Sequence, residues 1–83
     1  MKLNLRYFAS VRETLGLADE AWTSEATDVA GLLAELRARG GAYAQALAVG
    51  RPVRVAINQV MARADTPLAD GAEVGLFPPV TGG

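Results

Sequence analysis

The sequence predicts an α+β domain in which one mixed sheet of four to five strands carries one main helix on one face. Two segments, 2–7 and 53–57, alternate between polar and apolar residues as half-buried strands do. A third segment, 29–36, repeats its apolar residues with helical spacing. The chain has 83 residues, 51% of them hydrophobic, so we expect one domain with a core of its own.

The first strand and a short helix are expected at the N-terminal end. Residues 2–7 place Leu and Tyr on one face and Lys, Asn and Arg on the other, and Phe8 then falls on the polar face. Ser10 to Glu13 matches a capping box, which predicts a helix start at Ser10. Gly16 is suited to end that helix in the left-handed conformation.

A second strand and the main helix follow. Glu20–Thr23 is the second strand, with Trp22 as its large apolar residue, and Thr27 is the expected N-cap of the helix. Gly31 inside that helix costs about 1 kcal/mol relative to Ala, which favours close approach to a strand. The apolar stripe of the helix is formed by Val29, Leu32, Leu33 and Leu36.

The helical region ends at a glycine pair. Gly40-Gly41 stops the main helix, and Ala42–Val49 fits a short second helix with Tyr43 and Leu47 on one side. We expect Trp22 and Tyr43 in the core. The acidic residues are expected on the solvated surface.

The C-terminal half predicts three more strands. Residues 53–57 form one, Asn58-Gln59 a tight turn, Val60–Ala62 a short returning strand, and Asp70-Gly71 another turn. In the last strand Val74 and Leu76 should point inward, and Glu73, Gly75 and Phe77 outward. Pro78-Pro79 ends it, because proline cannot donate to a strand ladder. This order is compatible with a β-grasp roll, although periodicity alone does not fix the topology.

Composition excludes several classes of function. The sequence has no cysteine and no histidine, so it offers no thiolate nucleophile, no imidazole base and no cysteine-based metal site. We expect no bound metal or cofactor. The net charge is −1 and the eight basic residues are scattered, which argues against nucleic acid. A signal peptide and a membrane-spanning run are not visible, so a cytoplasmic location is the expectation.

The final two residues, Gly82 and Gly83, are the candidate functional site. Glycine has no side chain and great backbone freedom, which suits a tail that threads a narrow channel and presents its last carboxylate to an enzyme. We therefore expect residues 1–79 to form the folded domain and residues 80–83 a flexible tail. Pro78-Pro79 should hold the direction in which the tail leaves the strand, and Val80 to Gly83 can reach about 13–14 Å.

Four motifs show a resemblance to a known family. The chain resembles the small subunits of molybdopterin synthase, which are ubiquitin-like sulfur carriers, and the resemblance spans essentially its whole length. A bare Gly-Gly is a weak motif, but the ending with its preceding residues is a strong one. The matching residues are Phe8-Ala9-Ser10-Val11-Arg12-Glu13, Ile57-Asn58-Gln59, Pro67 to Val74, and Phe77-Pro78-Pro79-Val80-Thr81-Gly82-Gly83.

The resemblance implies a ubiquitin-like β-grasp fold and a chemical role for Gly83. An E1-like adenylyltransferase would use ATP to adenylate the carboxylate of Gly83, and sulfur from a persulfide donor would replace AMP to form a thiocarboxylate. The carrier would then dock on the large subunit, in a heterotetramer, and give its sulfur to cyclic pyranopterin monophosphate. The carrier itself would be a non-catalytic subunit, with Gly82 and Gly83 gripped in a tight tunnel.

Partner-binding residues are predicted around the tail. Phe8 and Phe77 both sit opposite the residues assigned inward, and two exposed aromatic residues on one sheet face favour a docking patch over core packing. Met61, just past the turn, is predicted to join them, beside Ala56. Arg12 is a candidate for a salt bridge with a partner, although a solvated helix residue explains it equally well. Residues Pro78, Pro79, Val80 and Thr81 complete the predicted contact region.

Three other functions stay open on the sequence. The chain could be a carrier for another pathway, such as thiamine synthesis or tRNA thiolation, since such carriers share the fold and the Gly-Gly ending. It could be a protein modifier that forms isopeptide bonds, although its single lysine, Lys2, makes chains built through this protein improbable. It could also be a plain interaction module, which would need no terminal Gly-Gly.

Overall fold

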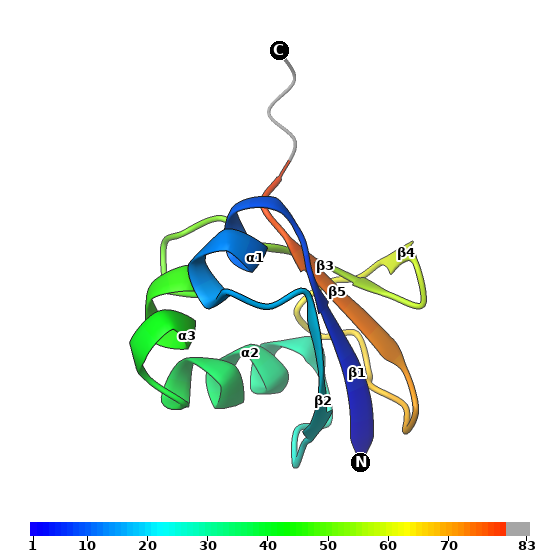
Figure 1. Ribbon diagram of the computed structural model, residues 1–83. Coiled ribbons are helices and arrows are strands. Elements are labelled where there is room, and N and C mark those ends of the chain that lie inside the picture. Colours follow the sequence, from blue (N-terminus) through cyan, green and yellow to red (C-terminus); the bar gives the residue numbers. More distant parts are fainter. Residues whose placement is uncertain (80–83) are drawn as a thin grey trace.

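The computed structural model describes residues 1–79, and the predicted tail residues Val80, Thr81, Gly82 and Gly83 lie outside the described residues. Five strands form one mixed sheet in the order β2-β1-β5-β3-β4, and the helices lie on one side of it (Figure 1). The elements are β1 (Lys2–Tyr7), α1 (Ala9–Leu15), β2 (Asp19–Thr23), α2 (Val29–Ala38), α3 (Gly41–Ala46), β3 (Arg54–Ile57), β4 (Val60–Met61) and β5 (Glu73–Phe77).

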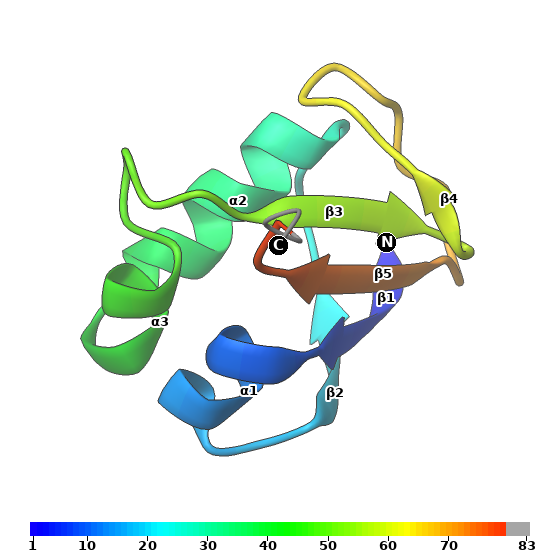
Figure 2. The ribbon, with the colours of Figure 1, turned by 90° about the horizontal axis from the view of Figure 1, so that it is seen from above.

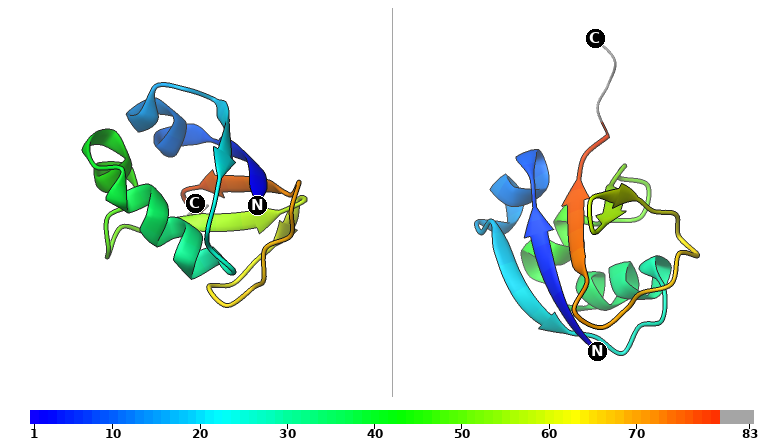
Figure 3. Two further views of the ribbon diagram at one scale, coloured as in Figure 1. Left: turned by 90° about the horizontal axis from the view of Figure 1, so that it is seen from below. Right: turned by 90° about the vertical axis from the view of Figure 1, so that its right-hand side faces the viewer.

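The first and last strands run parallel at the centre of the sheet, and all other neighbours are antiparallel. Tyr7 lies opposite Leu76, so β1 and β5 end at the same edge, as Figure 3 shows in its right-hand view. The backbone N–H of Phe8 continues this ladder by donating to the carbonyl of Leu76 at 3.0 Å. The segment after β1 and the residues after β5 therefore leave the sheet side by side. The strand order is that of a β-grasp roll.

The core lies between the sheet and the helices. Leu3, Leu5 and Tyr7 are buried and alternate with exposed residues, as the sequence predicts. On β5, Val74 and Leu76 are likewise fully buried. Each such side chain contributes about 1.5–3 kcal/mol when removed from water. The helix α2 buries Val29, Leu32 and Leu36 against them, whereas Leu33 is only partly covered.

Both predicted helix starts are wrong by one or two residues. Helix α1 begins at Ala9, directly after β1, with Phe8 as its N-cap and no side-chain capping bond. The carbonyl of Phe8 already accepts from the amides of Val11 and Arg12, so Ser10 lies inside the first turn and cannot form the predicted capping box. The predicted end of α1 is confirmed, because Gly16 adopts φ +77° and its N–H donates to the Arg12 carbonyl.

At the second helix the cap is Asp28 rather than Thr27. The Asp28 Oδ1 accepts from the amide of Gly31 at 2.9 Å, which satisfies one of the free N–H groups of the first turn. The prediction that Gly31 lies close to a strand is wrong. A Cβ at Gly31 would lie 3.1 Å from the Cβ of Ala26 and 3.2 Å from Asp28 Oδ1, so the close neighbours belong to the segment leading into α2.

The predicted turns are confirmed. Asn58 and Gln59 have φ of +50° and +70°, the backbone of the two-residue hairpin turn that joins β3 to β4. Gly71 has φ +83° in the turn before β5. Strand β4 ends at Met61, one residue earlier than predicted, although the amide of Ala62 still donates to the Val55 carbonyl at 2.9 Å. Helix α3 is shorter than the predicted 42–49.

A half-buried carboxylate ties the edge strand β2 to the rest of the domain. Glu20 accepts from the hydroxyls of Tyr7 at 2.7 Å and Tyr43 at 2.6 Å, and from Arg39 at 3.1 Å. Burial by itself would raise the pKa of Glu20, but these three donors together lower it below its ordinary value. Burial and the adjacent Glu20 raise the pKa of Tyr7 and of Tyr43.

A second carboxylate holds β2 against α2. Glu35 accepts from Trp22 Nε1 at 3.2 Å, from the Ser24 hydroxyl at 2.5 Å and from the backbone N–H of Glu25 at 2.7 Å. Burial opposes ionisation, yet these donors lower the pKa of Glu35. The prediction that the acidic residues are all solvated is therefore wrong for Glu20 and Glu35. Their ionised oxygens replace water with protein donors.

Candidate docking face and root of the tail

The two aromatic residues predicted to form a patch are in contact on the outer face of the sheet, away from the helices. The rings of Phe8 and Phe77 pack edge to face, with centroids 6.5 Å apart and an interplanar angle of 81°. Phe8 is 42% exposed, and Phe77 is half-buried. The prediction from the alternation of the strand residues places both aromatic residues on the correct face. It underestimates how much of the Phe77 side chain is buried.

A shallow apolar strip continues from these rings across the sheet. In the strand register Gly75 lies opposite Ala56, and Ala56 lies opposite Met61, which is 58% exposed. Gly75 points outward as predicted but is buried, because the Phe8 ring lies over it. A Cβ at Gly75 would stand 3.3 Å from Phe8 Cε2. The absence of a side chain at position 75 lets the Phe8 ring come close to the sheet.

Charged residues that were not predicted as site residues border the strip. The guanidinium of Arg6 lies 5.6 Å from the centroid of the Phe8 ring and 3.5 Å from the carboxylate of Glu73. Arg54 lies opposite Phe77 in the register. The alternation of residues 2–8 could have indicated Arg6, because Arg6 and Phe8 are two residues apart and therefore point to the same face of the sheet. The outer face therefore combines exposed aromatic surface with arginine.

The root of the tail adjoins this strip. Strand β5 ends at Phe77 as predicted, and Pro78 and Pro79 are half-buried. Arg12 is exposed on α1, the helix that starts directly after Phe8. The structure thus gathers Phe8, Arg12, Phe77 and the proline pair at one end of the domain, and Met61 lies further along the outer face. The remaining predicted contact residues, Val80 and Thr81, and the predicted reactive residues, Gly82 and Gly83, lie outside the described part of the chain.

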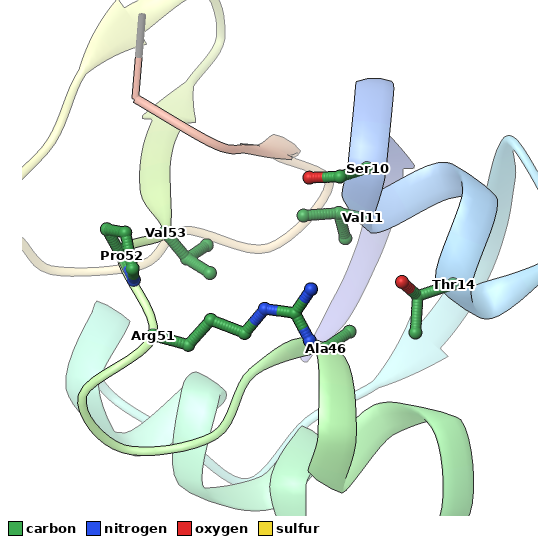
Figure 4. Close-up of a pocket in the computed structure, with 7 residues that line it drawn as sticks. All are labelled: Ser10, Val11, Thr14, Ala46, Arg51, Pro52 and Val53. Carbon is green, nitrogen blue, oxygen red and sulfur yellow. The ribbon is translucent and has the colours of Figure 1, made fainter. Parts of the chain in front are cut away.

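A small hollow lies between α1, the end of α3 and the segment before β3, and it is too small for a substrate. Figure 4 shows the hydroxyls of Ser10 and Thr14 and the guanidinium of Arg51 around it. Its volume of about 10 Å³ matches at most a single water molecule. Within residues 1–79, no cluster of three or more histidine, cysteine or acidic side chains is placed to hold a metal ion. None of the helices in this range has the length and apolar character needed to cross a membrane.

Comparison with known sequences decides the family. The model of the ThiS family matches residues 5–83. The chain belongs to the ThiS family. It is 37% identical to the molybdopterin synthase sulfur carrier subunit of Escherichia coli, over 98% of this chain and 99% of that protein. It is 34% identical to the subunit of the same name from Mycobacterium tuberculosis, over 100% of this chain and 99% of that protein.

Solved structures of similar shape confirm the β-grasp fold of this ThiS-family chain. It superimposes on SAMP1 from Haloferax volcanii with a TM-score of 0.77 and 25% identity, covering 100% of both chains. It also matches a complex of subunits 1 and 2 of the molybdopterin-converting factor from Helicobacter pylori, with a TM-score of 0.68, 27% identity and 100% of both chains covered. The predicted ubiquitin-like fold and the predicted family are therefore both confirmed.

Proposed function

We propose that this chain is the sulfur carrier subunit of molybdopterin synthase and acts in molybdenum cofactor biosynthesis. The observation that carries the proposal is similarity over nearly the full length to subunits of that name, on a chain whose sequence ends in Gly82-Gly83 after β5. The folded domain supports a carrier rather than a catalyst, since the sequence has no cysteine or histidine. The chemistry is therefore assigned to its carboxylate end and its partners.

The proposed chemistry begins with activation of Gly83. A terminal carboxylate has a pKa of roughly 3.3–3.7, so it is ionised at neutral pH and is a poor electrophile. An E1-like adenylyltransferase joins it to the AMP part of ATP and releases pyrophosphate. The terminal sulfur of a persulfide then attacks the acyl carbon, and AMP leaves. A thiol cleaves the S–S bond of the acyl disulfide, which leaves the thiocarboxylate on Gly83 and a disulfide on the donor side.

The proposed second half-reaction takes place on the large subunit. The outer face of the sheet, with Phe8, Phe77 and Met61, docks on that subunit, and the tail carries the thiocarboxylate into its active site to sulfurate cyclic pyranopterin monophosphate. Support comes from the exposed Phe8 and the half-buried Phe77 beside the root of the tail, and from the similar chain in the H. pylori complex of subunits 1 and 2. Arg12, exposed next to Phe8, is proposed to contribute an ion pair.

Mass spectrometry of the intact protein tests the carrier mechanism. The chain is incubated with the E1-like enzyme of the same cell, ATP and a persulfide donor. We expect a mass change equal to one oxygen replaced by one sulfur, located on Gly83 by fragmentation. A reaction without ATP is the control and should show no change. If the complete mixture leaves the mass unchanged, the carrier mechanism is wrong.

A protein modifier is the second candidate, and one observation favours it. SAMP1 has a similar structure, and its counterpart from Methanosarcina acetivorans is named a small archaeal modifier protein. The same acyl adenylate, attacked by a lysine amine instead of a persulfide, would yield an isopeptide bond. Branched peptides in which Gly83 of this chain is joined to lysines of cellular proteins would establish that activity; because no Lys or Arg follows Arg63, trypsin would leave residues 64–83 on the lysine. Their absence under conditions that yield the thiocarboxylate would restrict the chain to sulfur transfer.

A further inference from the structure

A second surface lies on the helix side of the sheet, between α2 and β3. Two hollows of about 290 and 250 Å³ adjoin there and share Leu33 and Val53 in their walls. Figure 2 shows α2 and β3 side by side along this boundary. We name this surface the α2–β3 groove. Its walls are formed by Val29, Leu33, Arg37, Leu47, Ala48, Val49, Gly50, Arg51, Val53, Arg54, Val55, Ala62, Arg63 and Ala64.

The groove has an apolar floor that the fold leaves partly uncovered. Leu33 and Val53 are packed against the core but only partly buried. Val49, in the segment between α3 and β3, is 87% exposed. These side chains belong to the apolar pattern of α2 and to the segment before β3, so the sequence supplies them as core residues. The β-grasp domain covers them incompletely.

The rim of the groove is strongly basic although the chain as a whole has a net charge of −1. Four of the seven arginines line the two hollows, and none of the aspartates or glutamates does. Within residues 1–79, Arg37, Arg51 and Arg54 form no ion pair, and Arg63 pairs only with the exposed Asp65 at 3.7 Å. By contrast, Arg6 and Arg39, outside the groove, are paired with carboxylates.

Two of these arginines are held in place by the backbone. Arg37 donates to the Leu47 carbonyl at 3.3 Å, and Arg51 donates to the Gln45 carbonyl at 3.1 Å. A guanidinium has five N–H donors, so each retains donors for a further partner. Arginine is well suited to bidentate recognition of carboxylates, and fixed guanidinium groups lose less entropy when they bind.

We propose that the α2–β3 groove binds an acidic peptide segment of a partner protein, with apolar side chains entering the two hollows and carboxylates pairing with the rim arginines. Charge complementarity and an apolar floor together select this occupant over a purely acidic one. The groove lies on the helix side, whereas Phe8 and Phe77 lie on the outer face. Among the rim arginines only Arg54 borders both surfaces, because it lies opposite Phe77 in the strand register. A carrier docked through its outer face therefore keeps Arg37, Arg51 and Arg63 free for a second partner.

Fluorescence anisotropy with a labelled twelve-residue peptide tests this proposal. The probe alternates Asp and Glu with Leu and Val. One comparison peptide replaces the acidic residues by Lys, a second replaces the apolar residues by Ser, and a single-stranded RNA of twelve uridines is the third. The full-length protein should bind the probe at least tenfold more tightly than any of the three. Equal binding of the serine peptide or of the RNA would overturn the proposal, since general charge attraction would then suffice.

Charge-reversal variants test whether the probe peptide binds in the α2–β3 groove. Arg63→Glu should raise the dissociation constant of the probe at least fivefold, because it reverses a charge on the rim. Lys2→Glu makes the same change in net charge away from the groove, at an exposed residue, and should have less than a twofold effect. Amide shifts on adding the probe should centre on Leu33 and Val53. Shifts centred on Phe8 and Met61 instead, or equal effects of the two charge reversals, would refute the assignment to the groove.

Discussion

The Phe8 ring lies over Gly75, so closely that a Cβ at position 75 would come within 3.3 Å of Phe8 Cε2. Gly75 sits on the central strand β5, opposite Ala56, and Phe8 follows the parallel strand β1. The shape of the proposed docking face thus depends on the absence of one side chain. Phe8 in turn packs edge to face on Phe77, so a displacement of its ring would alter both aromatic residues.

Gly75→Val should weaken docking without unfolding the domain. The added Cβ and its two methyl groups displace the far end of the Phe8 ring, which can rotate outward. The backbone at Gly75 does not have a positive φ, so valine can adopt it. We expect at least a fivefold loss of affinity for the large subunit by isothermal titration calorimetry. Ala21→Val enlarges an exposed residue of β2 and should leave affinity unchanged. Unaltered binding by the Gly75 variant would show that the ring position is irrelevant to docking.

Phe77→Ala should weaken binding to the large subunit selectively. A central interface aromatic commonly contributes about 2 kcal/mol or more, which corresponds to roughly a thirtyfold loss of affinity. Phe77 is half-buried, so a modest loss of thermal stability should accompany this. Thr23→Ala, at an exposed position of β2, is the control. If Phe77→Ala unfolds the isolated chain and shows no selective binding defect, the residue is core rather than interface.

Deletion of Gly83 should abolish sulfur transfer. The shortened chain misplaces the reactive carbon by one residue, about 3.5 Å, and errors smaller than this already reduce rates when reacting groups must be aligned. Affinity for the large subunit should change little, provided that docking relies on the outer face. Single-turnover sulfur transfer and calorimetry measure the two effects separately. Full transfer by the shortened chain would contradict the proposed mechanism.

Glu20→Gln should destabilise the domain at neutral pH. It should also reduce the dependence of the unfolding free energy on pH in the acidic range. The pKa of Glu20 is lower in the folded chain than its ordinary value of 4.5, so the unfolded state binds more protons as pH falls through that range. The stabilisation from Glu20 is therefore complete above about pH 5 and is lost at more acidic pH. The variant retains the similar contribution of Glu35.

At neutral pH we expect Glu20→Gln to cost about 1–3 kcal/mol of unfolding free energy, because hydrogen bonds to a charged group are weakened while their donors stay covered. The side chain of Glu20 is only 17% exposed. Chemical denaturation between pH 3 and pH 7, with Glu13→Gln at an exposed site of α1 as control, measures both effects. Parallel stability curves for the variant and the parent chain would rule out the proposed role of the Glu20 carboxylate.

Features that depend on neighbouring residues were predictable from the sequence. Alternation over 2–7 predicted β1 with its buried and exposed faces, and Asn58-Gln59 predicted the hairpin turn, because both follow from local backbone preference and side-chain direction. The alternation of residues along β1 and β5 also predicted that Phe8 and Phe77 lie on the outer face. The Gly-Gly ending with its preceding residues pointed to the carrier family, which the comparisons confirmed.

Contacts between segments that are distant in the sequence became visible only in the folded domain. Glu20 looked like a surface acid until strand pairing and α3 brought Tyr7, Tyr43 and Arg39 to it. Gly75 became buried because β1 runs parallel to β5 and delivers Phe8 to it. Four arginines spread over residues 37–63 lie around one groove, because the fold brings α2 and the segments before and after β3 together. Periodicity reports which face a side chain occupies, whereas its neighbours across the sheet depend on strand order, which periodicity does not encode.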